Sequence, residues 1–484
     1  MIIGAGQVTD HPSELSPSEL MVEAARRAAA DAGTGGAQIF DGIESIGVID
    51  CMSWAGGDPG RALAGMLGVS PRETSRTLLG GNSPLGLLGD TCERIQGGHL
   101  DSVLMLGAEA MNPLIKQVRQ GIPTGWGDPP LGEPDRLVGM NMEASAAAEM
   151  AAGLMLPVNY YPFFENAIRA ASGEPAAAHM EKVGRLWARF ADVASRNPNA
   201  WAREFPSAEE ITTVGPDNRM VSFPYTKLMT ANINVDQGAA LLMCSVAAAE
   251  AAGVPPDRWV FPVAVAGAHD HWLVGERDSL VRSPAIAACG ELAMGHAGVG
   301  IDDISHVDIY SCFPSAVQVS ARELGFGLED SRPPTVTGGL TFAGGPASNY
   351  VTHSLAAMTG ALRAQPGGRG LVTAVGWYLT KHAVAVLSSD PPEQAFAAFD
   401  PQDQIDSQPR REIAVDYSGA ATIESYTALY GKEAPTTGTV SCLLEDGRRA
   451  FAKSDDADAI AALIDGNPVG LPVQLDGAAG FEFA

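Results

Sequence analysis

A glycine turn that leads into a helix is the first place in this chain where chemistry could take place. Gly80 and Gly81 follow two leucines, and Ser83-Pro84 is typical of the first turn of a helix. The first N–H groups of a helix have no partner within it, so such a turn can bind an anion or hold a nucleophile. Glycine also lets a helix and a strand pack closely, and this structural interpretation is the simpler one for the turn taken alone.

The residues after the turn predict the elements that would hold it in place. They have one apolar helical stripe that ends at Gly97-Gly98 and consists of Leu85, Leu88, Cys92 and Ile95. The apolar run 103–106 follows, bounded by turn signals, and suits a buried strand.

The same order of elements occurs twice in the chain. In each half, an Ala-rich helix beginning at Ser-Pro is followed by a short apolar strand, a double glycine, a second helix and a buried-type strand. The corresponding segments are Ser16-Pro17 and Ser283-Pro284, residues 46–49 and 306–309, Gly80-Gly81 and Gly344-Gly345, and residues 103–106 and 371–375. We therefore expect two related α/β halves rather than one long sheet.

This arrangement resembles the thiolase superfamily. The resemblance covers about residues 1–390 and rests on GAEAM at 107–111, DQGAA at 236–240, YSCF at 310–313 and GGP at 344–346. It implies the thiolase αβαβα five-layer sandwich, like that of an acetyl-CoA acetyltransferase, with two central helices between two sheets.

The domain organisation follows from the resemblance and from a change of composition near Asp400. The expected parts are 1–111 and 233–265 for the N-terminal half, 112–232 for an inserted loop domain, and 266–399 for the C-terminal half. A polar linker then precedes residues 410–484, where strand-like segments and the hairpin signal Asp446-Gly447 predict a small all-β, OB-like domain.

The resemblance also implies where the catalytic residues should be. A thiolase carries its acyl group on a cysteine at the start of the first central helix, activated by the histidine of a GHP motif. Those two positions fall on Gly81 and Gly345, the second cysteine falls on Ala374, and the oxyanion-hole asparagine falls on Tyr310. Ordinary thiolysis through an acyl-cysteine is therefore not expected. A shifted register would place Ser83 there, a poor acyl carrier without a nearby histidine.

Tyrosines are the candidate catalytic residues that remain. Tyr310 and Tyr350 could donate a proton or bind an enolate oxygen. The same stretches place five other groups beside the expected pocket: Cys312, His353, Tyr378, Lys381 and His382. Of these, Cys312 is first interpreted as an inert core residue and Lys381–His382 as a structural hydrogen-bonding pair.

A ligand-binding role is expected for the residues around the double glycines and for nearby cations. Small residues at Gly81 and Gly345 should leave the cleft open for a CoA thioester. The candidate ligand-binding residues are Gly80, Asn82, Ser83, Gly344, Arg219 and Lys227. Arginines of the insertion could likewise meet CoA phosphates or could form a solvated helix face; they are Arg185, Arg189, Arg196 and Arg203.

Three functions stay open at this point, and whether the protein is an enzyme stays open with them. The first is binding of CoA or acyl-CoA in lipid metabolism with a degenerate thiolase site. The second is an acyl-CoA retro-aldolase or lyase that uses tyrosine in place of cysteine. The third, an active acetyl-CoA acetyltransferase, has the least support from the residues.

Composition limits the partners. The net charge of −26 over 484 residues argues against nucleic acid and anionic membranes. No apolar run reaches transmembrane length, the first residues do not resemble a signal peptide, and the six cysteines lack CxxC spacing. We expect a cytoplasmic protein with no metal and no cofactor beyond a CoA thioester ligand, acting as a homodimer or with a lipid-pathway partner.

Overall fold

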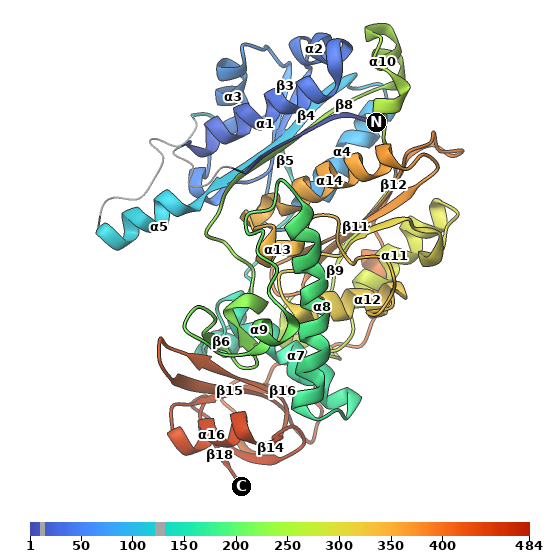
Figure 1. Cartoon of the computed structure of the whole chain (residues 1–484). Coiled ribbons are helices and arrows are strands. Elements are labelled where there is room, and N and C mark those ends of the chain that lie inside the picture. Colours follow the sequence, from blue (N-terminus) through green and yellow to red (C-terminus); the bar gives the residue numbers. More distant parts are fainter. Residues whose placement is uncertain (10–14, 122–130) are drawn as a thin grey trace.

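The structure, a computed structural model, describes residues 1–9, 15–121 and 131–484. Two sheets alternate with three layers of helices in the body of the protein, and a third sheet lies at one end (Figure 1). This arrangement confirms the predicted α/β sandwich of two related halves with an added β domain.

The first sheet has six strands in the order β1-β8-β4-β2-β3-β5. β8 runs antiparallel to both β1 and β4, whereas β4, β2, β3 and β5 are parallel. The strands are β1 (Ile2–Thr9), β2 (Ser45–Val48), β3 (Glu73–Thr77), β4 (Ser102–Ala110), β5 (Arg136–Val138) and β8 (Asp236–Cys244).

The second sheet has five strands in the order β10-β11-β12-β9-β13. β12 runs antiparallel to β11 and β9, and the edge strands are parallel to their neighbours. The strands are β9 (Phe261–His269), β10 (His306–Asp308), β11 (Arg369–Gly376), β12 (Lys381–Ser388) and β13 (Ala397–Phe399).

Two central helices lie between these sheets. α4 (Ser83–Gln96) contacts strands of both sheets, and so does α14 (Tyr350–Ala364). α4 forms as predicted, with Pro84 in its first turn and its leucines buried, and Gly98 beyond its end has a positive φ of 69°.

Outer helices cover the far faces of the two sheets (Figure 1). The outer face of the first sheet carries α1 (Pro17–Asp31), α2 (Gly33–Asp41) and α3 (Pro59–Leu67), and that of the second carries α11 (Pro284–His296) with α12 (Pro314–Leu324) beside it. Ser16 and Glu19 form the expected capping box before α1. Shorter helices are α10 (Val246–Ala252), α13 (Gly339–Phe342) and the 3-10 turn η6 (Ala347–Asn349).

The insertion between the halves is tied into the sheets on either side of it. It contains α5 (Met111–Gln120), α6 (Ala147–Ala151), α7 (Pro157–Ser172), α8 (Ala176–Arg196), α9 (Ala208–Thr212), β6 (Met220–Ser222) and β7 (Tyr225–Thr226). Its strand β5 extends the first sheet, while β6 pairs with the C-terminal sheet. Backbone pairing therefore joins the insertion to two other parts of the fold.

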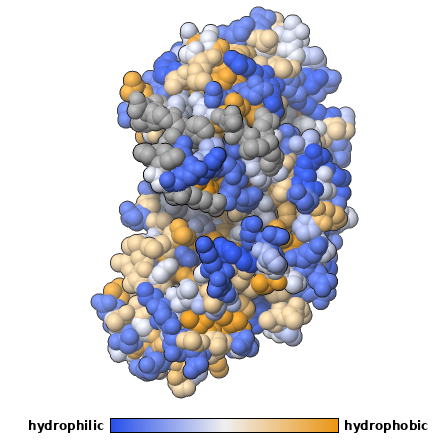
Figure 2. Space-filling view, turned by 60° about the vertical axis from the view of Figure 1, so that its left-hand side comes forward, coloured by the Kyte–Doolittle hydropathy of each residue, from blue (hydrophilic) through white to orange (hydrophobic). Residues whose placement is uncertain are grey.

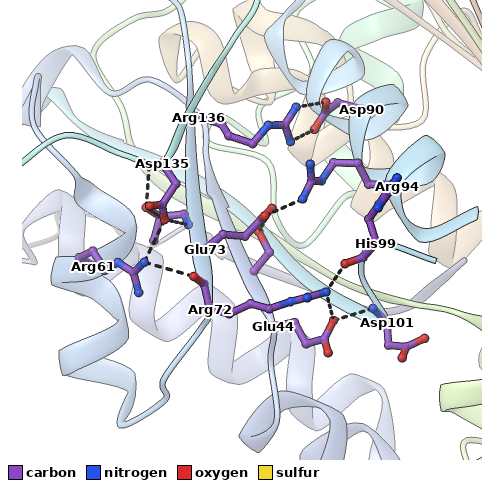
Figure 3. A network of polar contacts seen from close by, with 12 residues as sticks. Glu44, Arg61, Arg72, Glu73, Asp90, Arg94, His99, Asp101, Asp135 and Arg136 are labelled. Carbon is purple, nitrogen blue, oxygen red and sulfur yellow. Dashed lines mark hydrogen bonds and ion pairs between the residues drawn. The ribbon is translucent and has the colours of Figure 1, made fainter. Parts of the chain in front are cut away.

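Polar contacts to α3, α4 and β3 hold β5 at the edge of the first sheet (Figure 3). Arg136 of β5 makes a bidentate pair with Asp90 of α4, at 2.8 and 2.5 Å. Asp135 accepts a hydrogen bond from the Thr74 backbone N–H at 2.8 Å and forms a salt bridge with Arg61 at 2.9 Å. β5 thereby covers what would otherwise be a free sheet edge.

The C-terminal β domain is built on β14 (Ser418–Tyr430). Its antiparallel sheet continues through β15 (Pro435–Leu443), β16 (Arg449–Ser454), β17 (Pro472–Asp476) and β18 (Phe481–Phe483), with α16 (Ala457–Asp465) against it. The Lys453 N–H donates to Ala479 O at 2.8 Å, which brings the two ends of the sheet together as in a partly closed barrel.

The segment before this domain differs from the polar linker that we expected. It forms α15 (Gln402–Asp406), with Ile405 only 1% exposed, and Gln402 accepts a hydrogen bond from the His269 N–H at 2.8 Å. The buried side chain of Ile405 and the carboxamide of Gln402 therefore dock a segment whose composition predicts neither a helix nor a strand.

The surface is mixed in character. Figure 2 shows hydrophilic residues over most of one face, with apolar residues in scattered patches between them. Within the described ranges, no helix combines the length and the hydropathy needed to cross a membrane.

Candidate functional site

The first double-glycine turn and strand β4 contact the residues that follow the second double glycine. The Gly80 N–H donates to Ser348 Oγ at 3.1 Å, and Asn349 Nδ2 donates to Gly107 O at 2.7 Å. These contacts fix the start of α4 against η6 and the start of α14. The turn before α4 is therefore one wall of a site formed by both halves.

Gly81, at the expected nucleophile position, has no free space beside it. A Cβ built on Gly81 would lie 2.3 Å from the Tyr310 hydroxyl oxygen and 2.3 Å from Val375 O. The expectation that glycine leaves the cleft open here is wrong, because a tyrosine at the former asparagine position fills the volume that a cysteine side chain would need.

The second turn is also closed around its glycines. A Cβ on Gly345 would lie 3.2 Å from Asn232 O, which is a tight approach, and 3.6 Å from Leu340 Cβ, which is ordinary contact, so this glycine has close neighbours. Gly344 has φ of 107°, and its Cβ would lie 2.2 Å from Gln237 Oε1, which makes it a turn residue. Ala374 is 1% exposed within β11. An open cleft at Gly345 is thus a second expectation that the structure corrects.

Of the two candidate tyrosines, Tyr310 is the one whose hydroxyl is free of hydrogen bonds to the described residues. Its N–H is fixed by Thr373 Oγ1 at 2.8 Å, and its ring meets that of Tyr350 edge to face with centroids 5.5 Å apart. The residue is 6% exposed, and its hydroxyl takes part in none of the hydrogen bonds found among the described residues. Burial raises the pKa of Tyr310 well above its ordinary value, so the phenol keeps its proton and can donate it to a ligand oxygen.

Tyr350, in contrast, is committed to a buried polar network. Its hydroxyl lies 2.6 Å from Thr337 Oγ1 and donates to Asp308 Oδ1 at 3.4 Å. Asp308 also accepts from Ser354 Oγ at 2.8 Å and Thr335 Oγ1 at 2.9 Å. Burial raises the pKa of Asp308, and these donors oppose the rise. Tyr350 therefore supports the ring of Tyr310 while its own hydroxyl stays engaged.

Lys381 lies on the other side of the glycine turn. Its Nζ donates to Leu79 O and Asn141 Oδ1, both at 2.7 Å, and burial lowers the pKa of the amine to about 8. The β11–β12 hairpin that presents it contains Trp377 and Leu379 at positive φ, and the Tyr161 hydroxyl braces both residues at 3.1 Å.

His382 does not pair with Lys381, because successive residues of a strand point to opposite faces. It reaches Leu379 O at 3.0 Å and Asp270 Oδ2 at 3.2 Å instead. The structural interpretation is correct for the histidine, but the expected pair with Lys381 is wrong.

The remaining candidates divide into structural residues and surface cations. Ser83 Oγ donates to Leu78 O at 2.5 Å, and Asn82 Oδ1 is buried without a partner. Arg219 and Lys227 are exposed at the outer end of a segment whose Ala231 and Asn232 contact the site. The α8 arginines are satisfied locally: Arg185 by Glu181, Arg196 by Asp192, and Arg189 by backbone carbonyls.

The other chemically interesting side chains are inert in this setting. Burial raises the pKa of the Cys312 thiol to about 12 and lowers the pKa of His353 to about 3. His353 Nδ1 is 2.8 Å from Gln7 Oε1, and the Tyr378 hydroxyl donates to Met155 O at 2.7 Å.

Sequence reasoning missed the contact between Tyr310 and Gly81 and the role of Asn141. The first contact had a signal in the sequence. A tyrosine stands where the family has an asparagine, and a glycine stands where it has the cysteine, so the larger side chain can fill the space that the smaller one leaves. Asn141 lies in an irregular stretch with no periodic pattern, so only the fold brings it to Lys381.

Comparisons with known proteins bear on the family and the fold. A family model described as "Thiolase-like protein type 1 additional C-terminal domain" matches residues 400–477. The crystal structure of a monomeric SCP2-thiolase-like protein type 1 from Mycobacterium smegmatis is 31% identical, with 100% of this chain and 98% of that chain covered and a TM-score of 0.86. The comparison with curated proteins gives no match.

More distant structures share the fold. The Ltp2-ChsH2(DUF35) aldolase is 20% identical, with 80% of this chain and 97% of that chain covered and a TM-score of 0.59. Acetyl-CoA acetyltransferase from Syntrophomonas wolfei is 17% identical, with 80% and 98% covered and a TM-score of 0.58.

Proposed function

Because this chain belongs to the thiolase superfamily, with an SCP2-thiolase-like protein of type 1 as a relative over its whole length, we propose that it binds acyl thioesters of coenzyme A without forming an acyl-enzyme. The observation that carries the proposal is the Tyr310 hydroxyl at the place of the nucleophile beside Gly81. A phenol that keeps its proton is a hydrogen-bond donor for a carbonyl and a poor nucleophile.

The surroundings of that hydroxyl suit a thioester carbonyl. It sits at the start of α4, where the helix dipole favours partial negative charge on the ligand. The Tyr310 ring is held by its T-shaped contact with Tyr350, so the donor is already oriented before a ligand arrives. No covalent step is needed for binding of this kind.

Two exposed cations could meet the phosphates of the CoA part. Arg219 and Lys227 lie at the surface, and the segment after Lys227 runs inward, where Ala231 N–H donates to Cys312 O at 3.1 Å. We assign the phosphate end of the ligand to this outer position and the thioester to Tyr310.

Isothermal titration calorimetry with butyryl-CoA tests the proposal. The wild-type protein should bind it, and Tyr310→Phe should weaken binding by about tenfold, since one donor is lost with the ring kept. Tyr417→Phe, at a partly buried tyrosine of the C-terminal domain whose hydroxyl donates to Ala420 O, is the matched control and should bind like the wild type. Equal affinity for Tyr310→Phe would remove the basis of the proposal.

A second candidate function is cleavage of a carbon–carbon bond in a 3-hydroxyacyl thioester, in which Tyr310 would donate to the enolate oxygen that forms. The free hydroxyl of Tyr310 favours it. The reaction also needs a base for the substrate hydroxyl proton, and burial keeps both Tyr310 and Tyr350 protonated, so we rank it second. Chromatography after incubation with a 3-hydroxyacyl-CoA decides: an aldehyde or ketone and a shortened acyl-CoA would favour the lyase.

A further inference from the structure

Lys381 is a buried lysine in a protein whose other lysines are exposed. The sequence has six lysines, and the five others, Lys116, Lys182, Lys227, Lys432 and Lys453, are exposed to solvent. Lys381 is 5% exposed. Lysine is almost never fully buried unless something pairs with its charge.

No carboxylate pairs with this amine in the described part of the chain. Its contacts are the carbonyl of Leu79, the side-chain oxygen of Asn141 and, at 3.4 Å, the carbonyl of Met140. The buried Arg449, by comparison, has a bidentate partner in Glu424. Burial of a charge without a counter-ion is costly, so a negatively charged ligand is the natural partner of this ammonium group.

The Lys381 side chain packs directly against two glycines, and any larger residue at either position would displace it. A Cβ on Gly80 would lie 2.6 Å from Lys381 Nζ, and one on Gly376 would lie 2.9 Å from Lys381 Cε. The unpartnered Asn82 Oδ1 is 2.6 Å from both of these Cβ positions. By rotating half a turn, the Asn82 carboxamide can present its Nδ2 donor to a ligand at the same place.

The amine and the free phenol flank consecutive residues. Lys381 lies against Gly80, and the Tyr310 hydroxyl lies against Gly81. A ligand that meets both groups needs a carbonyl for the neutral donor and, a short distance away, an anion for the cation. Asn141, which shares the amine, is on an exposed stretch, so an anion can replace it as a partner.

We propose that Lys381 is the counter-ion for a carboxylate on the acyl group, so that the ligands are CoA thioesters of short dicarboxylic acids. This rests on the proposed function, since Tyr310 must hold the thioester carbonyl of the same ligand. One ammonium group matches the single charge of a carboxylate. A phosphate dianion needs several donors, which the single lysine does not supply.

Succinyl-CoA and butyryl-CoA are a matched pair of probes, because both carry four-carbon acyl groups and only the first has a free carboxylate. Calorimetry should give the wild type at least about tenfold tighter binding of succinyl-CoA. Lys381→Met should bring the ratio of the two affinities close to one, while Lys453→Met, at an exposed lysine, should keep the preference. A purely structural lysine would weaken both ligands equally, and that result would overturn the proposal.

A second measurement needs no variant and no CoA. Acetic anhydride labels accessible amines, and mass spectrometry of peptides gives the rate at each lysine. Succinate should slow the labelling of Lys381 at least about threefold relative to Lys453, since an engaged ammonium is protected. Inorganic phosphate at the same concentration should not.

The outcomes separate this inference from the proposed function. If wild type binds neither thioester but succinate protects Lys381, the acyl-CoA proposal fails and the carboxylate site stands. If both thioesters bind with equal affinity and succinate gives no protection, the carboxylate site fails and the acyl-CoA proposal stands. Equal protection by phosphate would overturn the assignment to a carboxylate.

Discussion

The hydroxyl oxygen of Tyr310 lies 2.3 Å from the point that a Cβ of Gly81 would occupy. Each residue thus explains the other: the tyrosine fits only because position 81 is glycine, and the glycine is required because the tyrosine is there. The exchange removes a covalent nucleophile and puts a hydrogen-bond donor in its place.

Gly81→Ala should lower the free energy of unfolding by about 1–3 kcal/mol, because one methyl group would overlap both Tyr310 and the carbonyl of Val375. Gly86→Ala in the same helix is the control. A Cβ there meets nothing within 4 Å, so the change should be neutral or stabilise by up to about 1 kcal/mol. Urea denaturation measures both, and equal stability of the Gly81→Ala variant and the parent would contradict the shared volume.

The two tyrosines should respond differently to loss of the hydroxyl. Tyr350→Phe leaves Thr337 and Asp308 with one partner fewer and should cost about 1–3 kcal/mol. Tyr310→Phe removes a hydroxyl that has no hydrogen-bond partner among the described residues and should change stability by less than about 0.5 kcal/mol. Thermal unfolding ranks the two variants, and a larger loss for Tyr310→Phe would show that its hydroxyl is structural.

Arg449 should be essential for docking of the C-terminal domain. It is fully buried, bonds Glu424 through two nitrogens, and donates to the carbonyls of Gly275 and Arg277 in the body of the protein. Arg449→Met should destabilise the protein by about 3–5 kcal/mol, since it leaves Glu424 without its partner. Arg448→Met, at the adjacent residue, whose side chain is 35% exposed and pairs only with Asp446 among the carboxylates of the described residues, should cost less than about 0.5 kcal/mol in the same denaturation experiment.

Lys381 should make stability depend on pH in the alkaline range. Its pKa is lowered from 10.5 to about 8 in the folded protein, so between those values the unfolded chain binds more protons and the free energy of unfolding rises with pH. From pH 7 to 9.5, wild type should gain about 2 kcal/mol relative to Lys381→Met. Denaturant titrations of the pair at both pH values give the difference, and a constant difference would mean that the amine is not desolvated.

Much of the fold was predictable because its signals are local and occur twice. Ser-Pro helix starts, double glycines and short apolar strands mark each half, and the central helix α4 begins where Ser83-Pro84 places it. The linker before the β domain was not predictable. Burial of Ile405 and the contact of Gln402 with His269 depend on a surface that only the folded body provides.

The site was less accessible to sequence reasoning for a related reason. Motif spacing located Gly81, Gly345 and Tyr310, but it treated each as a separate position. Whether a glycine leaves a cavity depends on what packs against it, and here Tyr310 comes from the other half of the chain. The burial of Lys381 could not be predicted for the same reason, because the residues that contact its amine, Leu79 and Asn141, are distant from it in the sequence.

Mass spectrometry of the protein with butyryl-CoA, recorded first under native and then under denaturing conditions, tests the central claim most directly. The account predicts a one-to-one complex in the native spectrum and the unmodified protein mass after denaturation. An adduct of butyryl mass that survives denaturation, or the absence of any complex in the native spectrum, would contradict it.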